Sequence, residues 1–165
     1  MDDERNKFDV DREWWLYERM FQEQRLRKQF IDENPDSSSG LMRKWQVRKE
    51  EVEAYQQEIE RFQELLLILM HISGGQAARA LELLGIRWKN TEQGGVCNIF
   101  IKDRLVAFVT TYHKGYRSSS NIKIIHRYLP WEIGELLVYY LWLVQLFHEK
   151  LQFQTEGKPC SSPFL

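Results

Sequence analysis

The sequence predicts a mainly α-helical fold with a small antiparallel three-stranded β-sheet. Apolar residues recur at helical spacing over 11–31 and over 43–71, as they do on one face of an amphipathic helix. Three short stretches rich in β-branched and aromatic residues, separated by turn-forming residues, predict strands at 96–102, 105–112 and 122–128. A last apolar helix is expected over 129–148, because proline is favoured in a first helical turn.

The N-terminal helix is expected to carry Trp14, Tyr17 and Phe21 at helical spacing, with charged residues between them. The sequence Asn-Pro-Asp-Ser-Ser-Ser-Gly at 34–40 is typical of a flexible break. The end of the chain has no periodicity and should be disordered. We therefore predict an N-terminal helical arm and linker at 1–40, a main body at 41–150 and a disordered tail at 151–165.

The second predicted helix, over 43–71, carries a stripe of apolar residues three and four positions apart: Val52, Tyr55, Ile59, Phe62, Leu66 and Leu69. A helix that faces the core of the domain explains this stripe, and a coiled-coil dimer seam is the alternative. The stretch Leu65–Met70 is apolar on all sides, which favours burial inside a domain.

A short helix is predicted over 76–86, after the long helix ends at the glycine cap Ser73-Gly74-Gly75. Arg79 and Glu82 are expected on neighbouring turns of one face of this helix. A polar, basic, serine-rich loop at 113–121 contains Lys114. An arginine near a helix start and a lysine on a hairpin are groups that can hold and protonate a phosphodiester.

Charge is distributed unevenly along the 165 residues, although the net charge is only −1. Between His71 and Pro130 the acidic residues are Glu82, Glu92 and Asp103, whereas the basic ones are Arg79, Arg87, Lys89, Lys102, Arg104, Lys114, Arg117, Lys123 and Arg127. A basic block in a neutral chain predicts a surface that faces a polyanion. A solvated basic face without a ligand is the alternative.

Several classes of site are not expected. Cys97 and Cys160 lack the spacing of metal ligands or of a disulfide framework, and no loop for a nucleotide is present. The N-terminus has no apolar signal region, and the apolar run at 133–147 falls short of the ~20 residues of a membrane span. We therefore expect no metal, cofactor, small-molecule substrate or membrane contact, and an intracellular location.

The order of these elements resembles the first half of the catalytic domain of tyrosine recombinases, the phage-integrase family. The residues that carry the resemblance are Ser73-Gly74, Arg79-Ala80-Leu81-Glu82-Leu83 and Ile86-Arg87-Trp88, followed by three strands and Lys114. One or two extra residues separate the glycines from Arg79. The region from about 50 to 147 is most similar to a recombinase-like region that precedes a RecQ-type helicase in telomere-linked ascomycete proteins, which would imply a nuclear location. No helicase motif is present here.

The resemblance implies that Arg79 holds the scissile phosphate, that Glu82 supports its helix and that Lys114 is the general acid. As alternatives, Glu82 would be a simple ion-pair partner of Arg79, and the two cations would have no catalytic role. The chain lacks the His-x-x-Arg and the later nucleophilic tyrosine of the family. It is therefore expected to be catalytically incomplete. The last apolar helix cannot cover itself, so the chain looks like a domain cut part-way, and a homo-oligomer that covers this helix is the alternative.

These observations predict a recombinase-like fragment that binds duplex DNA without sequence preference. The predicted contacts come from Arg79, Arg87, Lys114, Arg117, Lys123 and Arg127, with His113 and Tyr116 beside Lys114. A strand-transferring recombinase completed by a longer product, or an accessory region of an ATP-dependent DNA helicase, is one alternative. A remnant that does not bind DNA, or a coiled-coil interaction module, is the other.

Overall fold

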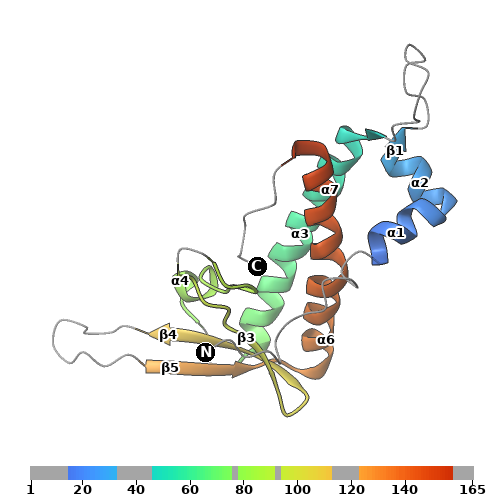
Figure 1. Cartoon of the computed structure of the whole chain (residues 1–165). Coiled ribbons are helices and arrows are strands. Elements are labelled where there is room, and N and C mark those ends of the chain that lie inside the picture. The colour runs from blue at the N-terminus through green and yellow to red at the C-terminus, as the bar shows by residue number, and fades with distance from the viewer. Residues whose placement is uncertain (1–14, 33–45, 76–77, 92–93, 113–122, 158–165) are drawn as a thin grey trace. The chain divides into compact units, whose positions relative to one another are not determined.

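The structure, a computed structural model, describes residues 15–32, 46–75, 78–91, 94–112 and 123–157. These residues are mainly helical and include a small three-stranded antiparallel sheet, as the sequence predicts (Figure 1). They divide into two compact units. Among the described residues, the first unit contains those up to Glu58 and those from Tyr140 onward. The second unit contains Ile59–Tyr139.

The first unit is built from short elements of both chain ends. They are α1 (Trp15–Gln22), α2 (Gln24–Phe30), β1 (Ile31–Asp32), β2 (Gln46–Val47), the start of α3 (Lys49–Ser73), the π-helix η3 (Tyr140–Gln145) and α7 (Leu146–Glu156). Its core contains Met20, Phe30, Val52, Phe147 and Leu151, all buried. Phe30 and Phe147 meet edge to face with their ring centroids 5.9 Å apart, a favoured geometry for aromatic pairs.

Three features of this unit differ from the sequence predictions. One N-terminal helix was expected, but Glu23 is extended and separates α1 from α2, so that Met20 and Phe30 enter the same core. Helix α3 begins at Lys49, because Gln46–Val47 pairs with Ile31–Asp32 as a strand. The described part of the expected arm thus packs within a unit that also contains α7.

The C-terminal helix also differs from its prediction. The helical residues after Pro130 form α6 (Trp131–Tyr139), η3 and α7 in direct succession. Helix α7 continues through Glu156, into the segment predicted to be a disordered tail, and ends at Gly157 with φ 68°. Gln145 explains part of the π-helical stretch, because its side-chain oxygen accepts a buried hydrogen bond of 2.7 Å from the Tyr140 hydroxyl.

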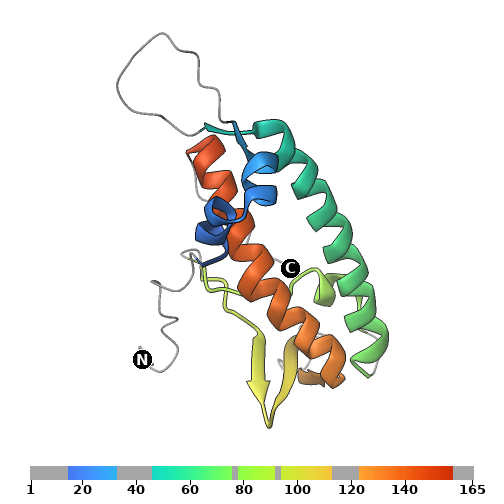
Figure 2. The ribbon, with the colours of Figure 1, turned by 90° about the vertical axis from the view of Figure 1, so that its right-hand side faces the viewer.

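The second unit contains the sheet, in the order β3 (Ile99–Lys102), β4 (Leu105–Tyr112) and β5 (Lys123–Tyr128). Both pairings are antiparallel, and the register places Phe108 opposite Ile99 and Arg127. The hairpin between β3 and β4, yellow in Figure 2, closes at Asp103 and Arg104, with φ of 52° and 65°. Two successive positive φ angles are those of a type I′ turn, which suits the twist of a hairpin.

One face of this sheet is covered by helices of the same unit. It carries Val106, Phe108 and Thr110, which are buried. A side chain at Gly134 of α6 would meet Val106 at 3.0 Å, and one at Gly74, after α3, would meet Phe108 at 3.3 Å. The short helix α4 (Ala80–Leu83) also contacts β4. Glycine therefore permits close approach of the α3 end and of α6 to this face.

The C-terminal half of α3 buries one side only. Leu66 and Met70 are buried, whereas Leu65 and Ile68 are 55% and 56% exposed. The expectation that Leu65–Met70 is buried all round is thus wrong. Within the predicted stripe, Val52, Ile59 and Leu66 are buried in the single chain, whereas Leu69 is 39% exposed, so the core-facing prediction holds for part of the stripe.

Candidate nucleic-acid interface

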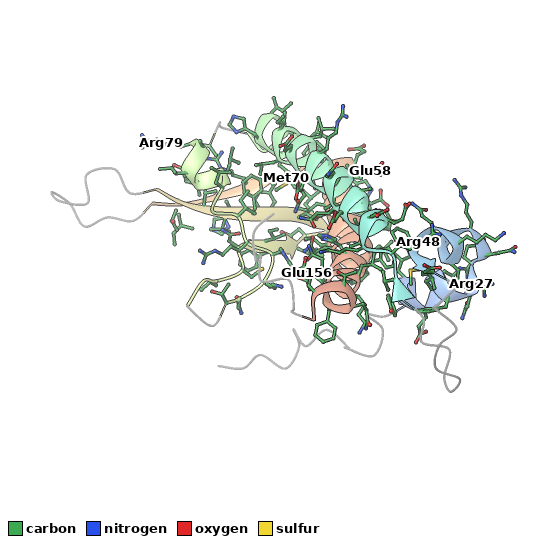
Figure 3. All side chains as sticks on the ribbon, turned by 90° about the horizontal axis from the view of Figure 1, so that it is seen from above. Arg27, Arg48, Glu58, Met70, Arg79 and Glu156 are labelled. Carbon is green, nitrogen blue, oxygen red and sulfur yellow. The ribbon has the colours of Figure 1, made fainter. Side chains whose placement is uncertain are left out.

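Arg79 precedes helix α4 and does not lie within it. It is the N-cap residue, with φ −75° and ψ 153°, and it is exposed (Figure 3). The helix comprises only Ala80–Leu83, shorter than the predicted 76–86. The Arg79 carbonyl accepts a hydrogen bond of 2.9 Å from the Glu82 N–H, and the Arg79 N–H donates one of 3.4 Å to the Glu82 carboxylate. Arg79 is thus fixed in backbone conformation at the exposed start of α4.

Glu82 joins α4 to the sheet. Its carboxylate lies 3.6 Å from the Arg127 guanidinium, and the exposed fractions of the two side chains are 11% and 4%. The Arg127 Nε–H also donates a hydrogen bond of 3.3 Å to the hydroxyl of Thr110, which is buried. Arg127, which the sequence places on a DNA-facing surface, is therefore inside the unit. Its burial removes the guanidinium from the set of exposed phosphate contacts.

The segment after α4 is tied to the sheet by Asn98. The Asn98 side chain accepts a hydrogen bond of 2.8 Å from the Arg87 N–H and donates one of 3.2 Å to the Gly85 carbonyl. The Asn98 carbonyl accepts one of 2.8 Å from the Val109 N–H. Arg87 is only partly exposed, and a side chain at Gly95 would occupy the space of its guanidinium. Arg87 therefore packs against the loop before β3.

The structure brings together only part of the predicted site. Glu82 and Arg127 meet, and Arg79 lies beside Glu82 at the start of the same helix. His113, Lys114, Tyr116 and Arg117 lie outside the described residues. Lys123 begins β5, but its side chain is also outside what the structure describes. The predicted general acid is therefore not placed relative to Arg79.

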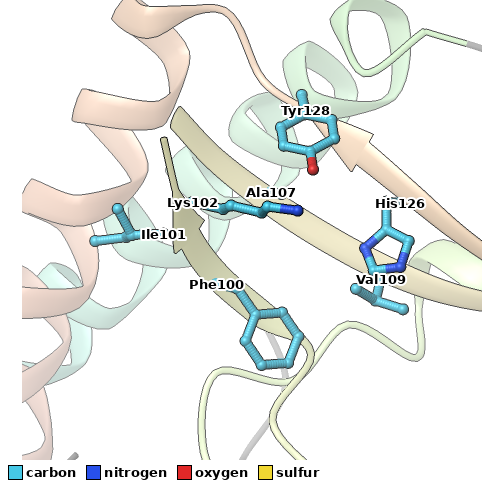
Figure 4. Close-up of a pocket in the computed structure, with 7 residues that line it drawn as sticks. All are labelled: Phe100, Ile101, Lys102, Ala107, Val109, His126 and Tyr128. Atoms are coloured by element: carbon cyan, nitrogen blue, oxygen red, sulfur yellow. The ribbon is translucent and has the colours of Figure 1, made fainter. Parts of the chain in front are cut away.

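The second face of the sheet carries exposed aromatic and basic residues that the sequence-based site does not include. A depression of about 350 Å³ on it is lined by Phe100, Ile101, Lys102, Ala107, Val109, His126 and Tyr128 (Figure 4). The signal for this face was present in the sequence, because alternate residues of a strand share one face. Phe100 with Lys102, and His126 with Tyr128, have that spacing.

The described part of the chain contains neither a membrane-spanning helix nor a cluster of metal-ligating side chains. No helix there is long and apolar enough to cross a membrane. No group of three or more His, Cys, Asp or Glu side chains there is arranged to hold a metal ion.

Comparisons of the chain with models of protein families, with curated proteins and with solved structures gave no match. The resemblance to tyrosine recombinases thus depends on the sequence motifs given above.

Proposed function

We propose that this chain is a recombinase-like module that binds duplex DNA through its phosphates and does not cleave DNA by itself. The observation that carries the proposal is the exposed Arg79 at the start of α4, on a helix that Glu82 joins to the buried Arg127. A guanidinium can present two parallel donors to phosphate oxygens. Fixing the backbone that carries it reduces the entropy lost on binding.

The burial of Arg127 gives the proposal a more definite form. The Glu82 carboxylate lies 3.6 Å from the Arg127 guanidinium and accepts a hydrogen bond from the Arg79 N–H, so it joins the start of α4 to β5, and the Arg79 residue there is exposed. In this proposal Arg127 acts as a positioning residue for α4. The DNA contacts come from Arg79 and, outside the described residues, from Lys114 and Arg117.

The test measures binding to a labelled duplex by fluorescence anisotropy at several salt concentrations. Removing one phosphate contact should lower the slope of log K against log salt by about 0.9. We expect this change for Arg79→Gln, together with weaker binding that does not depend on the DNA sequence. Arg25→Gln is the matched control, because Arg25 is an exposed arginine of α2 in the other unit.

Two results would overturn the proposal. One is binding of the wild-type chain that does not change with salt, or no binding at low salt. The other is an equal effect of Arg79→Gln and Arg25→Gln on the slope, which would indicate a diffuse attraction. A covalent adduct trapped on nicked DNA would instead support the strand-transfer alternative.

A further inference from the structure

Among the residues that the structure describes, the face of the sheet opposite the helices combines flat aromatic rings with cations. The register places Phe100, Ala107 and Tyr128 in one row across β3, β4 and β5. Phe100 is 49% exposed and Tyr128 40% exposed. Lys102 and His126, also exposed, belong to the same face. Val106, Phe108 and Arg127 belong to the opposite, helix-covered face.

The row has the dimensions of a stacking slot. Neighbouring strands are about 4.8 Å apart, so the Phe100 and Tyr128 backbones are separated by roughly 10 Å. Stacked rings have centroids about 4.5–7 Å apart, so one planar ring can lie between the two aromatic side chains. Ala107, the residue between them, has a small side chain that is only 3% exposed, so a base enters this row only when the Lys102 side chain, which lies over Ala107, moves aside (Figure 4).

The charges on this face select the kind of ligand. The Lys102 side chain lies over Ala107, between Phe100 and Tyr128, and its ammonium group points towards His126 (Figure 4). An organic cation would be repelled by this lysine, and a purely apolar partner would leave it without a counter-charge. A nucleotide has a planar base for the rings and a phosphate for the lysine and the imidazole.

We propose that this face binds single-stranded nucleic acid, with an unpaired base between Phe100 and Tyr128 and a neighbouring phosphate on Lys102 and His126. A paired base inside a duplex is stacked on its neighbours and cannot enter such a slot. Aromatic platforms of this kind accept any base, because every base has a flat face. This binding site is distinct from the Arg79 surface and does not depend on it.

The experiment measures anisotropy of a labelled thymidine oligonucleotide of about ten nucleotides, which lies within the range of known site sizes. The comparisons are an abasic oligonucleotide of the same length and a duplex. Phe100→Leu and Tyr128→Leu each remove a ring but keep an apolar side chain. Because a stacked base contributes about 1–3 kcal/mol, each should weaken thymidine binding at least about fivefold. Trp131→Leu, which alters an exposed aromatic residue of α6, should leave it unchanged.

Two further readouts separate stacking from attraction by charge. The abasic oligonucleotide should bind the wild-type chain weakly and should not distinguish it from Phe100→Leu. Lys102→Gln should lower the salt slope for the single strand by about 0.7. Circular dichroism of each variant checks that the exposed substitutions leave the fold intact.

Three outcomes would overturn the proposal. They are wild-type binding of thymidine by Phe100→Leu and Tyr128→Leu, equal affinity for the abasic oligonucleotide, and displacement by poly-glutamate as effective as by thymidine. The last would identify the face as a site for an acidic protein. Loss of duplex binding in Arg79→Gln with thymidine binding retained would support both proposals, whereas single-strand binding without any duplex binding would reject the duplex function alone.

Discussion

Arg79 and Arg127 belong to the same basic block of the sequence but lie in opposite environments. Arg79 is exposed at the start of α4, whereas Arg127 is buried beside Glu82 and Thr110. A buried charge is tolerated only when it is paired and hydrogen-bonded. The net charge of a segment therefore overestimates how many of its cations can face DNA.

Removing the buried guanidinium should destabilise the protein strongly. Arg127→Met leaves the Glu82 carboxylate inside the unit without its partner, and breaking such a pair costs about 3–5 kcal/mol. We expect a loss near 3 kcal/mol in the free energy of unfolding, measured with urea, because Glu82 is slightly exposed.

The double variant Glu82→Leu/Arg127→Met provides the decisive comparison. Replacing both charges by apolar groups of similar size should recover most of the lost stability. Arg25→Met is the surface control and should change stability by less than about 0.5 kcal/mol. If Arg127→Met changes stability no more than this control, the ion pair does not join α4 to the sheet.

Tyr55 predicts a loss of stability at alkaline pH. Burial and, to a smaller extent, the Glu58 carboxylate raise the pKa of Tyr55 from 10.0 to about 12. The unfolded chain releases this proton near pH 10, whereas the folded chain keeps it until about pH 12. Stability from this group is thus complete below pH 10 and is lost as the pH rises from 10 to 12.

The matched variant for this prediction is Tyr55→Phe, which keeps the ring against Phe30 and Phe147. Urea unfolding at pH values between 10 and 12 should show a smaller loss of stability for this variant than for the wild type. Some loss should remain, because burial also raises the pKa of Tyr17. Parallel curves for the two proteins would contradict the role of Tyr55.

At the scale of elements, the sequence predicted the three strands and the glycine end of α3 well. Their signals are local, namely β-branched runs, the turn at Asp103 and Arg104, and Gly74-Gly75. The helix breaks were missed because they depend on distant partners. Glu23 interrupts α1–α2 where both helices pack into one core, and Gln46–Val47 forms a strand only because Ile31–Asp32 pairs with it.

In the candidate site, too, features with a local sequence signal were predicted, and features that depend on a distant partner were missed. Arg79 and Glu82 were found from their spacing near a glycine break, but the partner of Glu82 lies in β5, far along the chain. Spacing alone could not distinguish Arg127 from the exposed cations. The alternation in β3 and β5 could have identified the open face, but which face the helices cover follows only from tertiary packing.

Gly134 is expected to set the distance between α6 and the sheet. A methyl group there would lie 3.0 Å from the Val106 side chain, and overpacking of a close contact typically costs about 1–3 kcal/mol. Gly134→Ala should therefore lower the free energy of unfolding in spite of the better helix propensity of alanine. Thermal or urea unfolding measures the change.

A double-variant cycle tests the cause. Val106→Ala removes the Cγ2 methyl group at 3.0 Å but keeps the Cβ at 3.1 Å from the new side chain, so Gly134→Ala should be somewhat less harmful in that background. An equal cost in both backgrounds would show that the Cγ2 methyl group of Val106 is not the obstacle. Gly94, which has open space around it and a φ of 85°, is unsuitable as a control because its cost would be conformational.

At the scale of the whole molecule, the described residues include many large apolar side chains that are exposed. Large exposed side chains include Leu65, Ile68 and Ile72 on α3, and Leu81 and Leu84 near α4. Contiguous exposed apolar surface of more than a few hundred Å² marks interaction sites or aggregation. With a net charge of −1, little electrostatic repulsion opposes association.

We therefore expect self-association that increases with protein concentration and is strongest near the isoelectric point of about 6.4. Ile68→Lys/Ile72→Lys places two cations among the exposed apolar residues of α3, namely Leu65, Ile68 and Ile72. This double variant should shift sedimentation-velocity profiles towards the monomer. The control is Gln57→Lys/Gln63→Lys, which adds the same two charges to α3 but leaves Leu65, Ile68 and Ile72 unchanged. This control should have a weaker effect on association. If both double variants shift the profiles equally, charge rather than these exposed apolar residues governs association; a monomer at every concentration would remove the basis for the predicted homo-oligomer.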